Sequence, residues 1–146
     1  MKKMNKKGFT LIEMLAVIAI IAVLVAIIVP AVGSSTLKAK ASTDAANLRS
    51  VLSAATIEYA EAGKLDALNV DAPVCKTVPE ATSIAIYKDG DELVAYYANG
   101  TSAYYNIKAF SDIADGTDTD GTPATATPTG TLQVTITGST VTVPTA

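Results

Sequence analysis

The sequence predicts an α+β protein in which a long N-terminal helix packs on a small antiparallel sheet of four or five strands. Apolar residues are concentrated in the first third of the 146-residue chain and continue there into a helical pattern. Beyond Gly63 the chain is rich in Thr, Ala, Asp and Gly, and short alternating segments are separated by turn signals. This length suffices for one domain but not for two well-built ones.

The first helical segment is apolar enough to span a membrane. Residues 14–32 are nineteen residues without a charge, MLAVIAIIAVLVAIIVPAV. As a helix this run is about 28 Å long, close to the ~30 Å hydrocarbon core of a bilayer. Apolar residues occur on every side of it. On hydropathy alone, a membrane anchor and a secretory signal peptide cut after about Ala31 remain equally open.

Charge is unevenly distributed along the chain. Four of the eleven basic residues lie in the first eight positions, where they fit a cytoplasmic flank of the apolar run. Without residues 1–8 the chain has seven basic and fourteen acidic side chains, a net charge of −7. Because such an acidic body repels phosphate, nucleic acid is not expected to be its main partner.

Glu13 lies at the edge of the apolar run. A carboxylate in a membrane helix is costly and usually has a partner. In one interpretation the side chain only reaches the headgroups from the helix end. In the other it meets a positive charge in an assembled state. A cut between Gly8 and Phe9 would provide that charge as the new α-amino group of Phe9.

Residues 7–13, Lys-Gly-Phe-Thr-Leu-Ile-Glu, resemble the prepilin processing motif of type IV pilins and their pseudopilin relatives. The resemblance is strong over residues 6–32 and weaker to about residue 62. It implies the type IV pilin fold, cleavage between Gly8 and Phe9 by the prepilin peptidase, and N-methylation of Phe9. It also implies assembly with identical or related pilin subunits into a helical filament, by a machinery with a cytoplasmic ATPase.

The resemblance also implies a domain organisation. Residues 1–8 are the leader, residues 9–32 the transmembrane and filament-core helix, and residues 33–62 an amphipathic helix. Residues 63–146 form the globular sheet head. The subunit is expected to cross the cytoplasmic membrane once before assembly and to lie in an extracellular pilus afterwards.

Three residues, Phe9, Glu13 and Pro30, are expected to act in assembly. Glu13 is expected to lack a partner in its own subunit, and in the filament the amine of Phe9 on a neighbour would neutralise it and fix the register. Pro30 cannot donate a helical hydrogen bond, so it should kink or locally open the helix. In the family, a proline at this place marks a stretch that unwinds when the filament forms.

A second helical stretch is predicted to end near Ala62, with Gly63 as its C-cap. Its apolar stripe is interpreted as core, with a free coiled coil as the alternative. The charged residues are expected to fall largely off the stripe: Lys38, Lys40, Asp44, Arg49, Glu58 and Glu61. The stripe consists of Leu37, Ala41, Ala45, Leu48, Leu52, Ala55, Tyr59 and Ala62.

The remaining chain is predicted to consist of strands and loops. Tyrosines on both sides of the turn at Asn99-Gly100, a strong two-residue hairpin signal, are expected to pair across strands. Residues 111–130 are expected to be a mobile surface loop. Strands are predicted at 83–88, 92–98, 101–107, 131–137 and 140–143, and a connecting loop at 64–82.

The sequence does not favour enzymatic activity or a cofactor. It contains no His, no phosphate-binding glycine loop and a single cysteine, Cys75, interpreted as a small, partly buried side chain. Asp115, Asp118 and Asp120 resemble a calcium loop only loosely, because the acids at the other expected positions are missing. A solvated acidic loop is the competing interpretation.

The leading functional hypothesis is a structural pilin of a surface filament used for adhesion, twitching motility or aggregation. Within the same class, the alternatives are the major pseudopilin of a type II secretion system and a competence pilin for DNA uptake. A simple membrane-anchored surface domain is the alternative from a different class.

Overall fold

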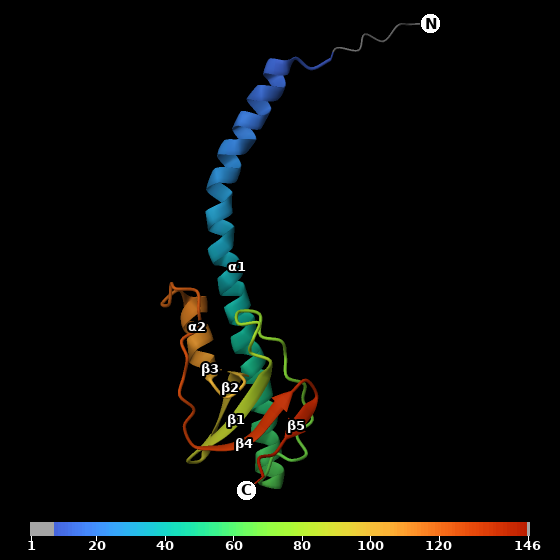
Figure 1. The fold of residues 1–146 in the computed structure, drawn as a ribbon, viewed down its shortest axis with the longest axis vertical. Helices are drawn as coiled ribbons and strands as arrows, with labels where there is room; N and C mark the ends of the chain where they lie inside the picture. The colour runs from blue at the N-terminus through green and yellow to red at the C-terminus, as the bar shows by residue number, and fades with distance from the viewer. Residues whose placement is uncertain (1–7, 146) are drawn as a thin grey trace, which may run out of the picture. The chain divides into compact units, whose positions relative to one another are not determined.

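The structure, a computed structural model, describes residues 8–145. These residues belong to two compact units that divide inside the long helix, between Thr36 and Leu37. The elements are, in chain order, α1 (Leu11–Ala62), β1 (Ser83–Asp89), β2 (Glu92–Asn99), β3 (Ala103–Asn106), α2 (Ile107–Asp115), β4 (Thr131–Thr137) and β5 (Thr140–Thr142) (Figure 1).

The sheet has five antiparallel strands in the order β3-β2-β1-β4-β5, so the predicted α+β architecture is confirmed. The turns after β1 and β4 are two-residue hairpin loops, because Asp89 pairs with Glu92 and Thr137 pairs with Thr140. The turn after β2 is longer than predicted, because Asn99 pairs with Ala103 across a loop of three residues.

One face of the sheet packs against the second half of α1. Alternate strand residues such as Ile84 and Ile86 on β1 point to the same side. They share one buried cluster with a stripe on α1, which includes Ala41, Leu48 and Ala55. The helix ends as predicted at Gly63, which has a φ of 71° and donates its N–H to the carbonyl of Tyr59.

Helix α2 replaces the end of one predicted strand and the start of the predicted loop. β3 stops at Asn106, whose side-chain oxygen accepts the N–H of Ala109 at 3.0 Å and caps the helix. Its apolar residues Phe110 and Ile113 are buried. The prediction of a loop is therefore wrong for residues 111–115, because their apolar face packs on the sheet.

Residues 116–130 have no regular secondary structure, but two hydrogen bonds tie them to the sheet. The N–H of Ala126 donates to the carbonyl of Tyr104 at 2.7 Å, and the hydroxyl of Thr129 donates to the carboxylate of Asp89 at 2.8 Å. The mobility of this segment stays a prediction.

The tyrosines pair across strands as the sequence predicted. Tyr97 on β2 lies directly opposite Tyr105 on β3. On the other face, the rings of Tyr87, Tyr96 and Tyr104 meet edge to face, with centroids 5.6–6.1 Å apart. These three rings therefore stabilise the sheet through side-chain contacts between β1, β2 and β3.

Candidate processing and assembly site

The first part of α1 exposes its apolar side chains. Sixteen large apolar residues from Phe9 to Val32 are each 47–79% exposed. An 18-residue window of this helix has a mean hydropathy of 3.2 and buries none of its residues, so α1 is long and apolar enough to cross a membrane. Soluble monomers rarely expose a contiguous apolar surface of this kind, which therefore requires lipid or protein around it.

The peptide bond between Gly8 and Phe9 lies outside the helix. Residues 8–10 have no regular secondary structure, and α1 begins at Leu11. Both Gly8 and Phe9 are exposed, and a Cβ atom at Gly8 would meet nothing within 4 Å. An exposed, non-helical segment is the kind of backbone that proteases cleave most readily. The basic residues of the predicted leader lie outside the described residues.

Glu13 has a partner in its own chain, and the expectation that it has none is wrong. Its Oε2 accepts the backbone N–H of Thr10 at 2.7 Å and the hydroxyl of Thr10 at 2.9 Å. In return the N–H of Glu13 donates to the Oγ1 of Thr10 at 3.3 Å. This reciprocal arrangement is a capping box, which satisfies donors at the open end of a helix.

The pattern Thr-x-x-Glu directly before an apolar run is the sequence signal of a capping box, and it is the signal from which this arrangement could be predicted. The carboxylate suggests a positive charge as its partner, whereas the partner in the structure is the hydroxyl three residues earlier. Thr10 is therefore an additional residue of this site.

Helix α1 continues without interruption through Pro30. The predicted local opening is not visible as a break in the helix of the single chain. Unwinding of this stretch on filament formation stays a prediction.

A second polar site lies in the sheet-bearing unit, around the carboxylate of Asp44. This residue is 0% exposed, although it was expected to fall off the buried stripe of α1. Its oxygens accept the backbone N–H of Lys76 at 2.9 Å, the N–H of Thr77 at 2.8 Å and the hydroxyl of Thr77 at 2.6 Å. Asp44 therefore fastens the loop after α1 to the helix.

The thiol of Cys75 completes this contact. Its Sγ donates to Asp44 at 3.5 Å and accepts the N–H of Val78 at 3.3 Å. Cys75 is 1% exposed, so it is more deeply buried than predicted. Burial and, to a smaller extent, the negative charge of Asp44 raise the pKa of the Cys75 thiol from 9.0 to about 11. The thiol is therefore neutral at physiological pH and serves as packing.

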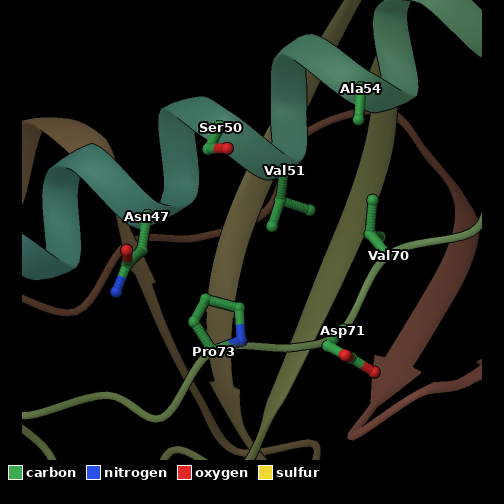
Figure 2. Close-up of a pocket in the computed structure, with 7 residues that line it drawn as sticks. All are labelled: Asn47, Ser50, Val51, Ala54, Val70, Asp71 and Pro73. Atoms are coloured by element: carbon green, nitrogen blue, oxygen red, sulfur yellow. The ribbon is translucent and has the colours of Figure 1, made fainter.

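Beside this contact, the loop and the helix enclose a shallow groove of about 290 Å³ (Figure 2). Helix side chains form one wall and a short stretch of the loop forms the other. Among the described residues that line it, Asp71 alone is ionisable, so titratable groups of residues 8–145 do not converge on this groove. The lining residues are Asn47, Ser50, Val51, Ala54, Val70, Asp71 and Pro73.

The structure does not gather the three aspartates that loosely resemble a calcium loop. Asp115 ends α2, and the carboxylate of Asp118 accepts the backbone N–H of Asp120 at 3.0 Å. Within residues 8–145, no three acidic, His or Cys side chains are grouped so that they could hold a metal ion.

A family model described as the prokaryotic N-terminal methylation motif matches residues 3–29. No curated protein and no solved structure matches the chain.

The chain thus carries the class III signal peptide of type IV pilins. Together with a long N-terminal helix packed on a five-stranded antiparallel sheet, this motif supports a type IV pilin-like protein, a structural subunit. In general the motif implies processing by a prepilin peptidase and assembly with other pilins. The apolar helix fits a membrane-anchored pilin.

Proposed function

We propose that this chain is the structural subunit of a type IV pilus, which polymerises through the first half of α1 into a surface filament. The observation that carries the proposal is the row of sixteen exposed apolar side chains from Phe9 to Val32, most of which lie within the methylation motif matched at residues 3–29. The sheet-bearing unit buries its own core against the second half of α1 and does not need this surface. A membrane before assembly, and neighbouring helices afterwards, would cover it.

The proposed processing preserves this surface. Cleavage between Gly8 and Phe9 removes the basic leader and leaves the whole apolar helix in the product. An ordinary signal peptidase cut after the apolar run would discard it. A filament subunit therefore keeps the apolar helix after cleavage, whereas a secreted domain loses it.

The proposed filament contact joins the Glu13 carboxylate of one subunit to the methylated α-amino group of Phe9 on its neighbour. In a core without water, both charges are costly unless they are paired. A wrong stagger between subunits would leave both unpaired, so the contact selects one register. Packing of the apolar side chains would provide most of the cohesion, and helix opening near Pro30 would allow the helices to pack closely.

Electron microscopy of sheared surface material tests the proposal with two matched variants. Glu13→Gln removes the charge from the proposed contact, and Glu61→Gln makes the same change at an exposed position near the other end of α1. Wild type and Glu61→Gln should yield filaments containing the chain, whereas Glu13→Gln should lose at least about nine tenths of them. Equal yields from all three chains would contradict the proposal.

Deletion of the chain, combined with electron microscopy of the wild type, separates the alternative uses of a pilin-like subunit. Absence of surface fibres in the wild type, together with loss of protein secretion when the chain is deleted, would support a type II secretion pseudopilin instead. Loss of DNA uptake on deletion, with normal secretion, would support a competence pilin.

A further inference from the structure

The start of α1 is fixed by Thr10. The carbonyl of Thr10 accepts the N–H of Met14 at 3.2 Å, which is the first hydrogen bond of the helix. Thr10 is therefore the N-cap residue, and Glu13 occupies the third helical position. This is the spacing at which a threonine and a glutamate satisfy each other's backbone donors.

The hydroxyl of Thr10 takes part in two of the three hydrogen bonds that join these residues. It donates to the Glu13 carboxylate at 2.9 Å and accepts the N–H of Glu13 at 3.3 Å. The closer these residues lie to the hydrocarbon core of a bilayer, the less water is present to replace these bonds. The hydroxyl therefore stabilises the subunit in the state in which Glu13 has no neighbouring chain.

We propose that Thr10 is the partner that holds the Glu13 carboxylate within its own chain before assembly. The filament contact of Glu13 is then an exchange of partners, not a first pairing. This inference rests on the proposed function, because it concerns a chain that assembles. Thr10 acts here as a positioning residue, since it works through the carboxylate of Glu13.

The Thr10–Glu13 capping box lies next to the proposed cleavage site, and this position determines how the Glu13 carboxylate could change partners. Glu13 Oε2 lies 2.7 Å from the backbone nitrogen of Thr10, the residue directly after Phe9. The carboxylate is thus held beside the residue whose α-amino group trimming would expose. A neighbouring subunit must draw Glu13 away from Thr10 before that carboxylate can serve the contact between chains.

The consequence is that loss of the hydroxyl favours the assembled state. Thr10→Val keeps the shape of the side chain and removes both hydroxyl hydrogen bonds, while Thr10→Ser keeps the hydroxyl and is the matched control. The ratio of filament to membrane-pool subunit should rise about fivefold in Thr10→Val, the equilibrium factor typical of losing one threonine N-cap. The ratio should stay near wild type in Thr10→Ser.

Amide hydrogen exchange on the full-length precursor in lipid nanodiscs provides the second measurement. The Glu13 amide should exchange about fivefold faster in Thr10→Val than in wild type and Thr10→Ser, because its acceptor is gone. This readout needs neither trimming nor assembly. It keeps the inference testable if the valine variant is not processed.

Two results would overturn the inference. One is a filament ratio that falls or stays unchanged in Thr10→Val, because the hydroxyl would then be needed in the filament or be irrelevant. The other is an unchanged exchange rate of the Glu13 amide. Failure of the proposed function is distinguishable from both, since wild-type chains would then form no filament of any kind.

Discussion

Replacing Asp44 with alanine removes the acceptor that joins α1 to the loop after it. The carboxylate is fully buried and receives the N–H groups of Lys76 and Thr77 and the hydroxyl of Thr77. In the alanine variant these donors face an apolar methyl group. The loop should then detach from the helix or remain in place with unsatisfied donors.

The magnitude follows from the exposure of the donors. A buried donor left unsatisfied costs about 1–3 kcal/mol, so two backbone N–H groups give about 2–6 kcal/mol. Lys76 is exposed and Thr77 half-buried, so water reaches part of the loop. Removing the carboxylate also removes its own desolvation cost. The expected loss is therefore about 2–3 kcal/mol of the free energy of unfolding, a large share of the 5–15 kcal/mol of a typical domain.

Urea unfolding of the full chain in non-ionic detergent, followed by the near-ultraviolet circular dichroism of its tyrosines, measures this loss. Asp44→Asn keeps one oxygen acceptor and should lose about half as much. Glu61→Ala changes an exposed acid on the same helix and should stay within about 0.5 kcal/mol of wild type. A loss below about 0.5 kcal/mol for Asp44→Ala would refute the assignment of Asp44 as the main fastening of this loop.

The remaining predictions concern one glycine and the cysteine. Gly130 has a φ of +85°, and a Cβ atom there would lie 2.0 Å from the carbonyl oxygen of Lys88, so Gly130→Ala should cost about 3 kcal/mol or more. Gly90→Ala, at a φ of +61° with nothing within 4 Å, should cost only about 1 kcal/mol in the same assay, and equal losses would contradict the clash. Because the folded-state pKa of Cys75 is raised from 9.0 to about 11, its contribution to stability is complete below about pH 9 and is lost as pH rises through 11. The free energy of unfolding should therefore fall by about 1–2 kcal/mol less between pH 9 and 11 in Cys75→Ala than in wild type. An equal fall in both chains would show that the thiol does not cause it.

The structural features that depend only on residues adjacent in the sequence could be predicted from it. Asp89-Gly90 and Gly138-Ser139 mark the two-residue hairpins because a tight turn between strands needs a residue that tolerates positive φ, and both glycines adopt it. Gly63 ends α1 for the same reason. The apolar run after residue 13 needs only length and hydropathy to be recognised.

Helix α2 was missed because its signals are short and compete with a strand pattern. Tyr104, Tyr105 and Ile107 favour strands, so the sequence alone continues the strand to Ile107. Asn106 stops it by capping the helix, and the spacing of Phe110 and Ile113 then buries one face. Nine residues are too few for a period of 3.6 to outweigh the composition around them.

Asp44 was missed for a different reason. Its position, three residues after Ala41 and four before Leu48, places it on the buried stripe. A carboxylate is rarely fully buried without a partner, so its charge favours the solvated side of the helix when no partner is known. The partners are backbone donors of a loop more than thirty residues away, which no periodicity in the sequence indicates.

Mass spectrometry of the subunit recovered from the cell surface tests most directly the claim that the apolar helix is retained after trimming. We expect a chain that begins at Phe9, carries one added methyl group on its α-amino nitrogen and extends through the sheet-bearing unit. A subunit that still begins at Met1, or one that begins beyond Ala31, would contradict the account.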